Sequence, residues 1–460
     1  MRTHFTEAQL ADPQIGASQA AIRKCVHCGF CTATCPTYVL LGDERDSPRG
    51  RIELIQAMLE NGGPPAPSTV THVDRCLSCL ACTTTCPSGV DYAQLIDHAR
   101  AHIEATHVRP WPERALRLAL AWVLPYRRRF AVALALGRMA RPLAPTFDRL
   151  GLRPLAAMLR LILPQREARQ GEVAQRAGGG FIPGAGGSNP LSRRVYPRAG
   201  QGPDPGATAP PGGGHLRSPR RVILLQGCIE PVLAPQIREA AIRLITRAGY
   251  EVVLAPSEGC CGALSEHLGR AVEAKAMARV NLKTWAAVGE VAAIITTAAG
   301  CGTAIKGYGK LLGYTAGPPA RDILEFIAEV GLPPVVRATD MAVAYHAACS
   351  LQHGQQIKTA PVRLLTEAGF EVRPVAEGHL CCGSAGVYNI LQPELATQLR
   401  DRKAANIAAT GAKVVAAGNI GCMTQLAPVL DAAIIHPVEL LDWATGGPRP
   451  AGILAGDDTS

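Results

Sequence analysis

Two copies of one cysteine run constrain this 460-residue chain more than any other feature. The first copy reads CVHCGFCTATCP from Cys25, and the second reads CLSCLACTTTCP from Cys76. Each has the spacing C-x2-C-x2-C-x3-C-P, the run used by proteins that hold two 4Fe-4S clusters. Three thiolates spaced three residues apart can wrap one cubane, while the fourth lies beyond their reach and points to the neighbouring site.

On this pattern the two clusters exchange their fourth ligands. The first cluster is predicted to bind Cys25, Cys28, Cys31 and Cys86. The second cluster is predicted to bind Cys76, Cys79, Cys82 and Cys35. A zinc ribbon would leave the third cysteine of each run unused, and a disulfide knot is the other alternative. A doubled run of eight cysteines favours the two-cluster interpretation over both.

The opening residues contain no apolar segment of signal-peptide length, so we expect a cytoplasmic protein whose thiolates survive as metal ligands. Lys and Arg number 47 against 37 Asp and Glu, a formal net charge of +10. Such an excess can serve an anionic membrane surface, an acidic partner or nucleic acid. Aromatic residues make up only 4% and no base-stacking motif is present, so we expect no nucleic-acid partner.

Residues 1–105 are predicted to form the two-cluster domain. Ser47 and Pro48 between the runs are typical of a helix cap and first turn, and an apolar face continues to Gly62. Arg49 and Arg51 at this helix start favour a solvated position over a role in tuning a cluster potential.

Residues 106–164 are helical in pattern and rich in arginine, but no apolar run approaches the roughly 20 residues that span a bilayer. This segment could lie on a membrane surface, pack against a partner subunit or cover the cluster domain, and the sequence leaves these open. Peripheral attachment to the cytoplasmic face of the inner membrane is therefore kept as an option. Residues 165–220 are rich in glycine and proline, which predicts a flexible linker and a domain boundary.

Beyond the linker the chain repeats with a period of 121 residues, which predicts two modules at 221–335 and 336–450. Short apolar strands precede each cysteine or cysteine pair, and helical segments separate them. Each module therefore reads as β-α-β-α-β with a short parallel sheet. The fold class is multidomain: a helical ferredoxin-like domain followed by a duplicated α/β domain.

The repeated cysteines follow the predicted strands, where open α/β sheets place their sites. Glycines beside them are expected to let the backbone approach a bulky metal centre. Four thiols at identical offsets in two copies predict a metal or redox site in each module. The candidate ligands are Cys228, Cys260, Cys261 and Cys301 in the first module, and Cys349, Cys381, Cys382 and Cys422 in the second.

The stretches GCCGA, HLCCGSAGVYN and NIGCMTQL resemble the CCG domain of heterodisulfide reductases and related iron-sulfur subunits. Two ferredoxin-type runs followed by two CCG domains are similar to the iron-sulfur subunits of bacterial glycolate oxidase, also called glycolate dehydrogenase. The resemblance implies two 4Fe-4S clusters, with further iron-sulfur clusters in the CCG domains. It also implies flavoprotein partners, one of which carries FAD and oxidises glycolate to glyoxylate.

The chain departs from the heterodisulfide reductase pattern at the end of each module. Those domains end in a C-x-x-C pair, but the positions three after Cys301 and Cys422 are Ala304 and Gln425. The segment Ala347 to Cys349 also lacks a cysteine that some relatives carry. Four thiols per module remain enough for an ordinary cluster, whereas the disulfide-cleaving chemistry is not supported.

Dinucleotide, P-loop and flavin motifs are absent from the sequence in a suitable strand-to-helix context. We therefore predict an electron relay, with no catalytic residue of its own, that passes electrons from a partner flavin to a quinone or other acceptor. Equivalent subunits of lactate, glycerol 3-phosphate or heterodisulfide-type enzymes remain alternatives, as does an iron-sulfur sensor or scaffold. His346, His353 and His379 lie near the second module and are expected to be structural.

Overall fold

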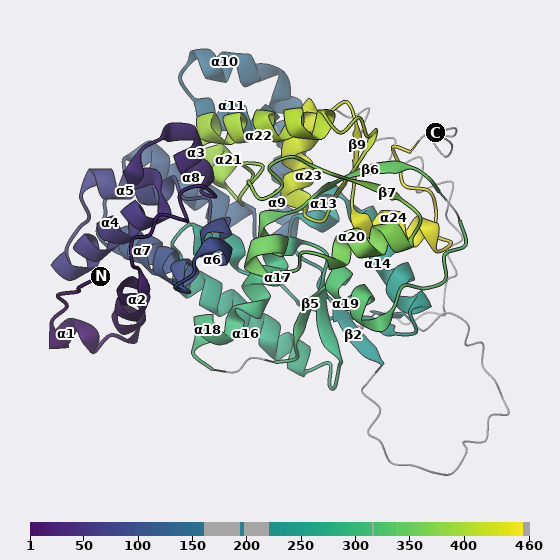
Figure 1. Ribbon diagram of the computed structural model, residues 1–460, viewed down its shortest axis with the longest axis horizontal. Helices are drawn as coiled ribbons and strands as arrows, with labels where there is room; N and C mark the ends of the chain where they lie inside the picture. The colour runs from purple at the N-terminus through teal and green to yellow at the C-terminus, as the bar shows by residue number, and fades with distance from the viewer. Residues whose placement is uncertain (161–193, 197–219, 315–316, 338, 454–460) are drawn as a thin grey trace, which may run out of the picture.

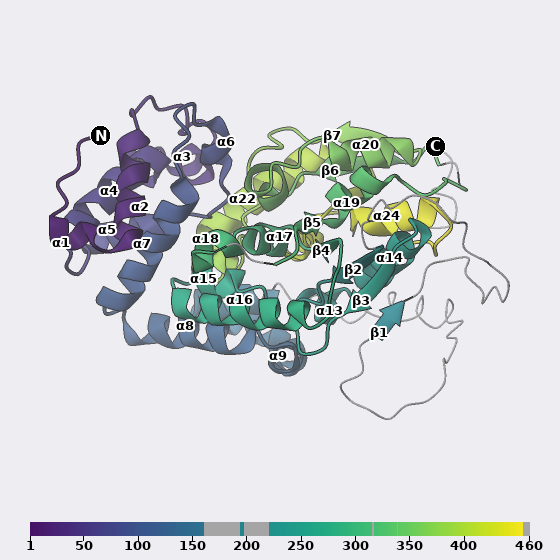
Figure 2. The ribbon, with the colours of Figure 1, turned by 90° about the horizontal axis from the view of Figure 1, so that it is seen from below.

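The computed structural model describes residues 1–160, 194–196, 220–314, 317–337 and 339–453. Figure 1 shows an N-terminal group of helices on one side and two sheets with their covering helices on the other. This arrangement confirms the predicted fold class of a helical domain followed by a duplicated α/β domain. Between them run the helices of the arginine-rich segment, which Figure 2 shows passing beneath the first module.

The N-terminal domain is entirely helical over its described elements. Its longest connecting helix, α4, begins as the sequence predicts: the Ser47 side chain accepts a hydrogen bond from the amide of Gly50, Pro48 occupies the first turn, and Gly62 closes the helix in a left-handed conformation. The helices are α1 (Glu7–Leu10), α2 (Pro13–Lys24), α3 (Pro36–Leu41), α4 (Pro48–Asn61), α5 (Pro67–Asp74), α6 (Ala81–Thr85) and α7 (Tyr92–Thr106), with a 3-10 turn at Glu44–Asp46.

The arginine-rich segment wraps the α/β part of the molecule. Its helices are α8 (Trp111–Val123), α9 (Arg127–Ala140), α10 (Ala144–Arg149) and α11 (Arg153–Arg160), with a 3-10 turn at Arg141–Leu143. Leu120 and Ala121 of α8 are buried with Leu268 of the first module and Ile390 of the second. The arginine-rich segment therefore packs against both modules and also connects the N-terminal domain to the first of them. Within the described residues, none of the helices combines the length and apolar character that a membrane crossing requires.

The first module holds a five-stranded sheet in the order β1-β3-β2-β4-β5. The strands are β2 (Arg221–Leu224), β3 (Glu251–Leu254), β4 (Ala293–Thr296) and β5 (Ala320–Asp322), all parallel, with β1 (Arg194–Tyr196) antiparallel at the edge. The helices are α13 (Glu230–Leu233), α14 (Pro235–Arg247), α15 (Ala263–His267), α16 (Ala271–Ala286), α17 (Ala299–Lys306), α18 (Tyr308–Leu312) and α19 (Ile323–Val330).

The second module repeats this plan with a four-stranded parallel sheet in the order β7-β6-β8-β9. The strands are β6 (Ala342–His346), β7 (Glu371–Pro374), β8 (Val414–Ala417) and β9 (Ala433–Ile435). The helices are α20 (Ala360–Glu367), α21 (Tyr388–Leu391), α22 (Pro393–Ala408), α23 (Ile420–Leu426) and α24 (Pro437–Ala444), with a π-turn at Ser350–Gly354. The predicted parallel β-α-β-α-β pattern is confirmed, and each module gains a further strand after its last cysteine.

The two modules share one buried core, which includes strands and helices from both. Helix α24 at the end of the second module packs on α14 of the first. Asp442 on α24 is buried and binds the guanidinium groups of Arg243 and Arg247 on α14. Nε2 of His436, just before α24, lies 2.8 Å from the carbonyl oxygen of Thr297. The modules are therefore two halves of one folded body.

The predicted linker at 165–220 lies largely outside the described residues. Its described part contains β1, in which Tyr196 pairs with Val252 of β3. This stretch is ordered strand, which the glycine- and proline-rich composition around it did not predict.

Candidate metal centres

One hollow is lined by the first cysteine run together with the end of the second run. Cys25, Cys28, Cys31 and Cys86 all line it, together with Cys82. Pro48, Ile52 and Val90 supply apolar walls. These four cysteines are the set predicted for the first cluster, gathered from both runs as the exchange of fourth ligands requires.

A second hollow is lined by Cys35, Cys76, Cys79 and Cys82. Cys35 comes from the first run and the other three from the second, so the structure brings together the set predicted for the second cluster. Cys82 lines both hollows, which places the two candidate sites side by side. The hydroxyl of Tyr92 lies 3.7 Å from the Cys76 sulfur at the wall between them.

Each run curls around its hollow through two residues in the left-handed backbone region. They are His27 and Gly29 in the first run and Ser78 and Leu80 in the second, at matching positions. Three of the four carry a side chain, for which this conformation is uncommon and costs free energy. Its repetition at equivalent places indicates that the curled shape is required in both copies.

Most of these thiols lie away from water. Cys28 is exposed and Cys31 and Cys86 are half-buried, whereas the other five are buried: Cys25, Cys35, Cys76, Cys79 and Cys82. Burial raises the pKa of Cys31 to about 11, and burial raises the pKa of Cys79 and of Cys82 well above the usual range. Without a metal these thiols stay protonated at neutral pH. A 4Fe-4S cluster supplies the positive charge that replaces those protons, so the donor set fits such a group.

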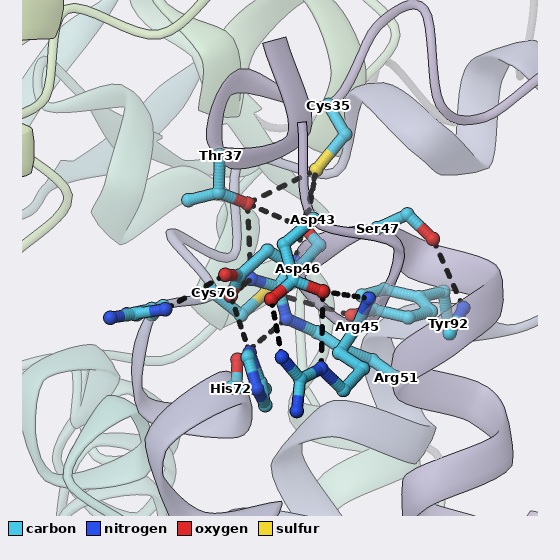
Figure 3. A network of polar contacts seen from close by, with 12 residues as sticks. Cys35, Thr37, Asp43, Arg45, Asp46, Ser47, Arg51, His72, Cys76 and Tyr92 are labelled. Atoms are coloured by element: carbon cyan, nitrogen blue, oxygen red, sulfur yellow. Dashed lines mark hydrogen bonds and ion pairs between the residues drawn. The ribbon is translucent and has the colours of Figure 1, made fainter. Parts of the chain in front are cut away.

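A buried charged network supports the second hollow, as Figure 3 shows. Asp46 is fully buried and forms ion pairs with Arg51, at 3.2 Å, and Arg75, at 2.9 Å. Nη2 of Arg51 donates to Thr37 at 3.0 Å, and its Nη1 lies 3.8 Å from the Cys35 sulfur. Thr37 also lies 3.3 Å from that sulfur. The network fixes Cys35 next to a cation that lacks contact with water.

The expectation of a solvated helix start is therefore wrong for Arg51, whose side chain is only 1% exposed. Sequence reasoning missed it because Asp46 and His72 lie on other turns of the chain and meet Arg51 only in the folded domain. Arg49 fits the expectation better: it is part-exposed, pairs with Glu44, and donates to the carbonyl oxygen of His27 at 3.3 Å.

In the first module the four candidate thiols form a connected group beyond the ends of the parallel strands. The Cys228 and Cys260 sulfurs are 3.5 Å apart. Cys261 interacts with both Cys260 and Cys301, and these interactions together with burial raise its pKa well above the usual range. The hydroxyl of Tyr308 donates to the carbonyl oxygen of Cys261 at 2.8 Å and holds the pair in place.

The second module gathers its thiols in the same way. The Cys349 and Cys381 sulfurs are 3.8 Å apart, and Cys382 interacts with Cys381 and Cys422. One ring nitrogen of His346 also lies within 4.8 Å of the Cys382 and Cys422 sulfurs. The structure thus adds a histidine that the sequence interpretation treated as structural. His353 is hydrogen-bonded and His379 is exposed, which agrees with that interpretation for both.

The glycines of the CCG pairs are required for a reason different from the expected one. Gly262 and Gly383 both have a positive φ, +90° and +85°. A Cβ on Gly383 would lie 2.5 Å from the carbonyl oxygen of Ala396, and one on Gly262 would lie 3.2 Å from that of Ala274. These glycines let the cysteine pair approach the backbone of a helix, α22 or α16, so the constraint comes from the fold around the thiols.

The N-terminal domain meets the second module beside the second hollow. Cys79 and Leu77 share a buried apolar cluster with Cys381 and Tyr388, and Cys349 packs against it. Oγ1 of Thr84 lies 2.8 Å from Nδ1 of His353 across this contact. The candidate second cluster site and the candidate site of the second module are therefore neighbours.

Comparison with known proteins agrees with this division. Residues 21–90 match the 4Fe-4S dicluster domain family, and residues 222–306 and 343–427 each match the cysteine-rich domain family CCG. Across 455 residues the chain is 36% identical to the glycolate oxidase iron-sulfur subunit of Escherichia coli K12, covering 96% of this chain and 99% of that protein. The chain belongs to the family of glycolate oxidase iron-sulfur subunits.

Two further relatives are less similar to this chain. The probable glycolate oxidase iron-sulfur subunit of Bacillus subtilis is 29% identical over 425 residues, which is 89% of both chains. Lactate utilization protein A of Exiguobacterium is 26% identical over 236 residues, or 48% of this chain and 95% of that protein. The glycolate oxidase subunits are thus similar along nearly the whole chain, whereas the lactate protein matches about half of it.

Proposed function

We propose that this chain is the electron-transfer subunit of a multi-subunit glycolate oxidase. It takes electrons from a partner flavoprotein that oxidises glycolate to glyoxylate and delivers them to a quinone or another acceptor. When bound, iron-sulfur clusters pass electrons singly, with potentials set by charge, hydrogen bonds and exposure. The observation that carries the proposal is the gathering of cysteines from both runs around two adjoining hollows in a chain similar to such subunits along 96% of its length.

The proposed ligand sets are those the sequence predicts. Cys25, Cys28, Cys31 and Cys86 hold the first 4Fe-4S cluster, and Cys76, Cys79, Cys82 and Cys35 hold the second. The four cysteines of each CCG module hold a further metal centre. The protein residues around these sites then orient the thiolates, exclude water and set the local charge.

We place the acceptor of the second cluster's electrons in the second module. Cys79 and Cys381 share one apolar cluster, so no layer of bulk water separates the two candidate sites. Electrons entering at the first hollow therefore have a continuous protein path through the second hollow to Cys349 and Cys381. The first module also touches the N-terminal domain, where α15 packs on α7 and Lys310 pairs with Asp91, and it forms a branch or the end of this path.

The substrate chemistry is assigned to a partner chain that carries FAD. The sequence of this chain carries no flavin or dinucleotide motif in a suitable strand-to-helix context. Localisation follows from the same assignment, with a cytoplasmic subunit that reaches a membrane acceptor through its complex.

The test is anaerobic iron and sulfide analysis, with EPR, of the chain co-expressed with its neighbouring subunits before and after addition of glycolate. Reduced 4Fe-4S signals that appear with glycolate, at about eight irons or more per chain, support the proposal. Clusters that respond to lactate or glycerol 3-phosphate and stay silent with glycolate would change the substrate and keep the relay. Zinc in place of iron would overturn both.

A further inference from the structure

The two modules differ at one buried position beside their thiols. His346 ends strand β6 of the second module, and the residue at the matching place in the first module is Leu225, next to the end of β2. Both side chains are buried, at 2% exposure for the histidine and 5% for the leucine. The repeat thus places an imidazole where its sister module has a hydrocarbon.

The imidazole lacks the contacts that normally explain a buried histidine. Among the residues that the structure describes, neither Nδ1 nor Nε2 of His346 has a hydrogen-bond partner. Burying such polar atoms unpaired costs free energy, so a group that is absent here is expected to satisfy at least one of them. His436 of the same module offers the contrast, because both of its ring nitrogens have partners.

The missing partner is indicated by what faces the ring. A nitrogen of His346 and the sulfurs of Cys382 and Cys422 all lie within 4.8 Å of one another, and all three side chains are buried. Two ligands of one tetrahedral metal are separated by roughly 3.5 to 4 Å, given metal–sulfur and metal–nitrogen bonds of about 2.3 and 2.0 Å. The three atoms are therefore close to the spacing of ligands around a single metal atom.

The surrounding charges suit thiolates at this place. Lys403 of α22 is buried and donates to the carbonyl oxygen of Glu377 at 2.7 Å. Its ammonium group lies close enough to Cys382 and Cys422 to interact with both electrostatically. The amide of Asn419 donates to the Cys422 sulfur at 3.5 Å. The residue of the first module that matches Asn419 is Ala298. In the equivalent helix α16 the place of Lys403 is taken by the neutral Asn281, whose side-chain amide donates to the carbonyl oxygen of Cys260 at 3.0 Å, so the cation belongs to the second module alone.

The thiols of the second module also fall into two pairs with different surroundings. Cys349 and Cys381 pack in the contact with the N-terminal domain, whereas Cys382 and Cys422 belong to the core that the two modules share. His346 lies beside the second pair. An imidazole ligand here would make the two modules electronically unequal.

We propose that His346 binds the metal of the second module through a ring nitrogen, together with Cys382 and Cys422. The metal is a thiophilic transition metal that also accepts imidazole, which is either the iron of a cluster or a zinc ion. The first module, with Leu225 in this place, binds its metal through sulfur alone. The inference rests on the proposed metal-binding role of the CCG cysteines.

The experiment uses the full chain co-expressed with its neighbouring subunits and purified anaerobically, with iron and zinc measured per chain. For iron, pulsed EPR of the reduced protein is recorded with histidine labelled by ¹⁴N or ¹⁵N. For zinc, X-ray absorption at the zinc edge reports its nitrogen and sulfur ligands. We expect a metal-bound histidine nitrogen in one of these two measurements.

The variants separate a ligand from a structural histidine. His346→Leu copies the residue of the first module and should remove the nitrogen signal, and His346→Gln should remove it with the polar character retained. His379→Gln changes an exposed histidine two residues from Cys381 and should leave the signal in place. A nitrogen signal that survives His346→Leu, or sulfur-only coordination in the unaltered protein, overturns the inference.

The variant Cys382→Ser distinguishes two outcomes: a second module that binds metal without His346, and a second module that binds no metal. If this variant loses metal while the unaltered protein shows only sulfur ligands, the second module binds metal without His346. If the variant keeps its full metal content, the metal-binding role of the module fails together with the inference. Labelled unaltered protein gives the decisive reading even if a variant does not fold.

Discussion

Thr84 Oγ1 lies 2.8 Å from Nδ1 of His353, which joins the second cysteine run to the second CCG module. Nε2 of His353 lies 3.1 Å from the carbonyl oxygen of His379. Because a carbonyl oxygen only accepts, Nε2 carries the proton of the neutral ring. Nδ1 then accepts from the Thr84 hydroxyl, whose proton is shared with the carbonyl oxygen of Ala81 at 3.1 Å. The bond therefore fixes one tautomer and one orientation of the ring across the contact.

Thr84→Val should loosen this contact. The substitution removes the hydrogen bond to His353 and the bond to the carbonyl oxygen of Ala81 within the run. Loss of the bond to His353 is expected to lower the free energy of unfolding by about 1 kcal/mol beyond the loss in the control, and to speed hydrogen exchange in residues 79–86. Thr83→Val is the matched control, because the Thr83 hydroxyl donates only to the carbonyl oxygen of Leu80 within its own run. Equal exchange in both variants would show that the bond to His353 does not hold the two parts together.

Cys35→Ser should affect the cluster of the second run. The Cys35 sulfur lines the hollow of Cys76 and Cys79, so EPR of the reduced protein is expected to change in the same component as for Cys76→Ser. Cys86→Ser should instead change the component altered by Cys25→Ser. If each fourth cysteine affected the cluster of its own run, the exchange of ligands between the runs would be wrong.

Arg51→Met should be costly. The substitution leaves the fully buried Asp46 paired with Arg75 alone among the arginines and removes the bonds from Arg51 to Thr37 and to the carbonyl oxygen of His72. Leaving these buried acceptors unsatisfied is expected to cost about 1–3 kcal/mol. Urea unfolding of the anaerobic protein measures this loss. Arg49→Met is the control, because its pair with Glu44 is part-exposed and pairs of that kind contribute about 1 kcal/mol or less. A similar small loss for both would contradict the structural role of the network.

Gly383→Ala should destabilise the protein more than the replacement of another glycine with positive φ. Its new Cβ would meet the carbonyl oxygen of Ala396 at 2.5 Å, whereas a Cβ on Gly289, also at positive φ, meets nothing within 4 Å. We expect a loss of about 1 kcal/mol for Gly289→Ala and about 1–3 kcal/mol more for Gly383→Ala. Thermal unfolding of both variants checks the difference, and equal losses would remove the clash as its cause.

Acid should weaken the junction between the modules through His436. Burial lowers the pKa of His436 to about 4, from 6.5 in the unfolded chain. Between about pH 6.5 and pH 4, His436 is protonated in the unfolded chain but neutral in the folded protein. The free energy of unfolding therefore falls as the pH drops through this range.

Between pH 7.5 and 5.5 this single group should cost about 1.4 kcal/mol. Urea unfolding at the two pH values, for the unaltered protein and for His436→Gln, isolates the effect. The variant is expected to be less stable at pH 7.5 and to lose less on acidification. An equal loss in both proteins would assign the pH dependence to other groups.

The sequence predicted the parts of this structure that depend on local spacing. The crossing of Cys35 and Cys86 between the two sites followed from the cysteine spacing, and the parallel strands of both modules followed from the repeat. Contacts between distant residues could not be read in this way. Arg51 appears solvated until Asp46 and His72 are folded around it, and His346 resembles any core histidine until Cys382 and Cys422 are brought beside it by the topology.

Helix α24 packs on the first module but is synthesised well after it. Its residues 437–444 cover α14, and its Asp442 neutralises Arg243 and Arg247 on that helix. When the first module has just emerged from the ribosome, α24 has not yet been synthesised. Helix α14 then still exposes its apolar face, and Arg243 and Arg247 lack their carboxylate partner. The packing of α14 can therefore be completed only after residues 437–444 have been synthesised.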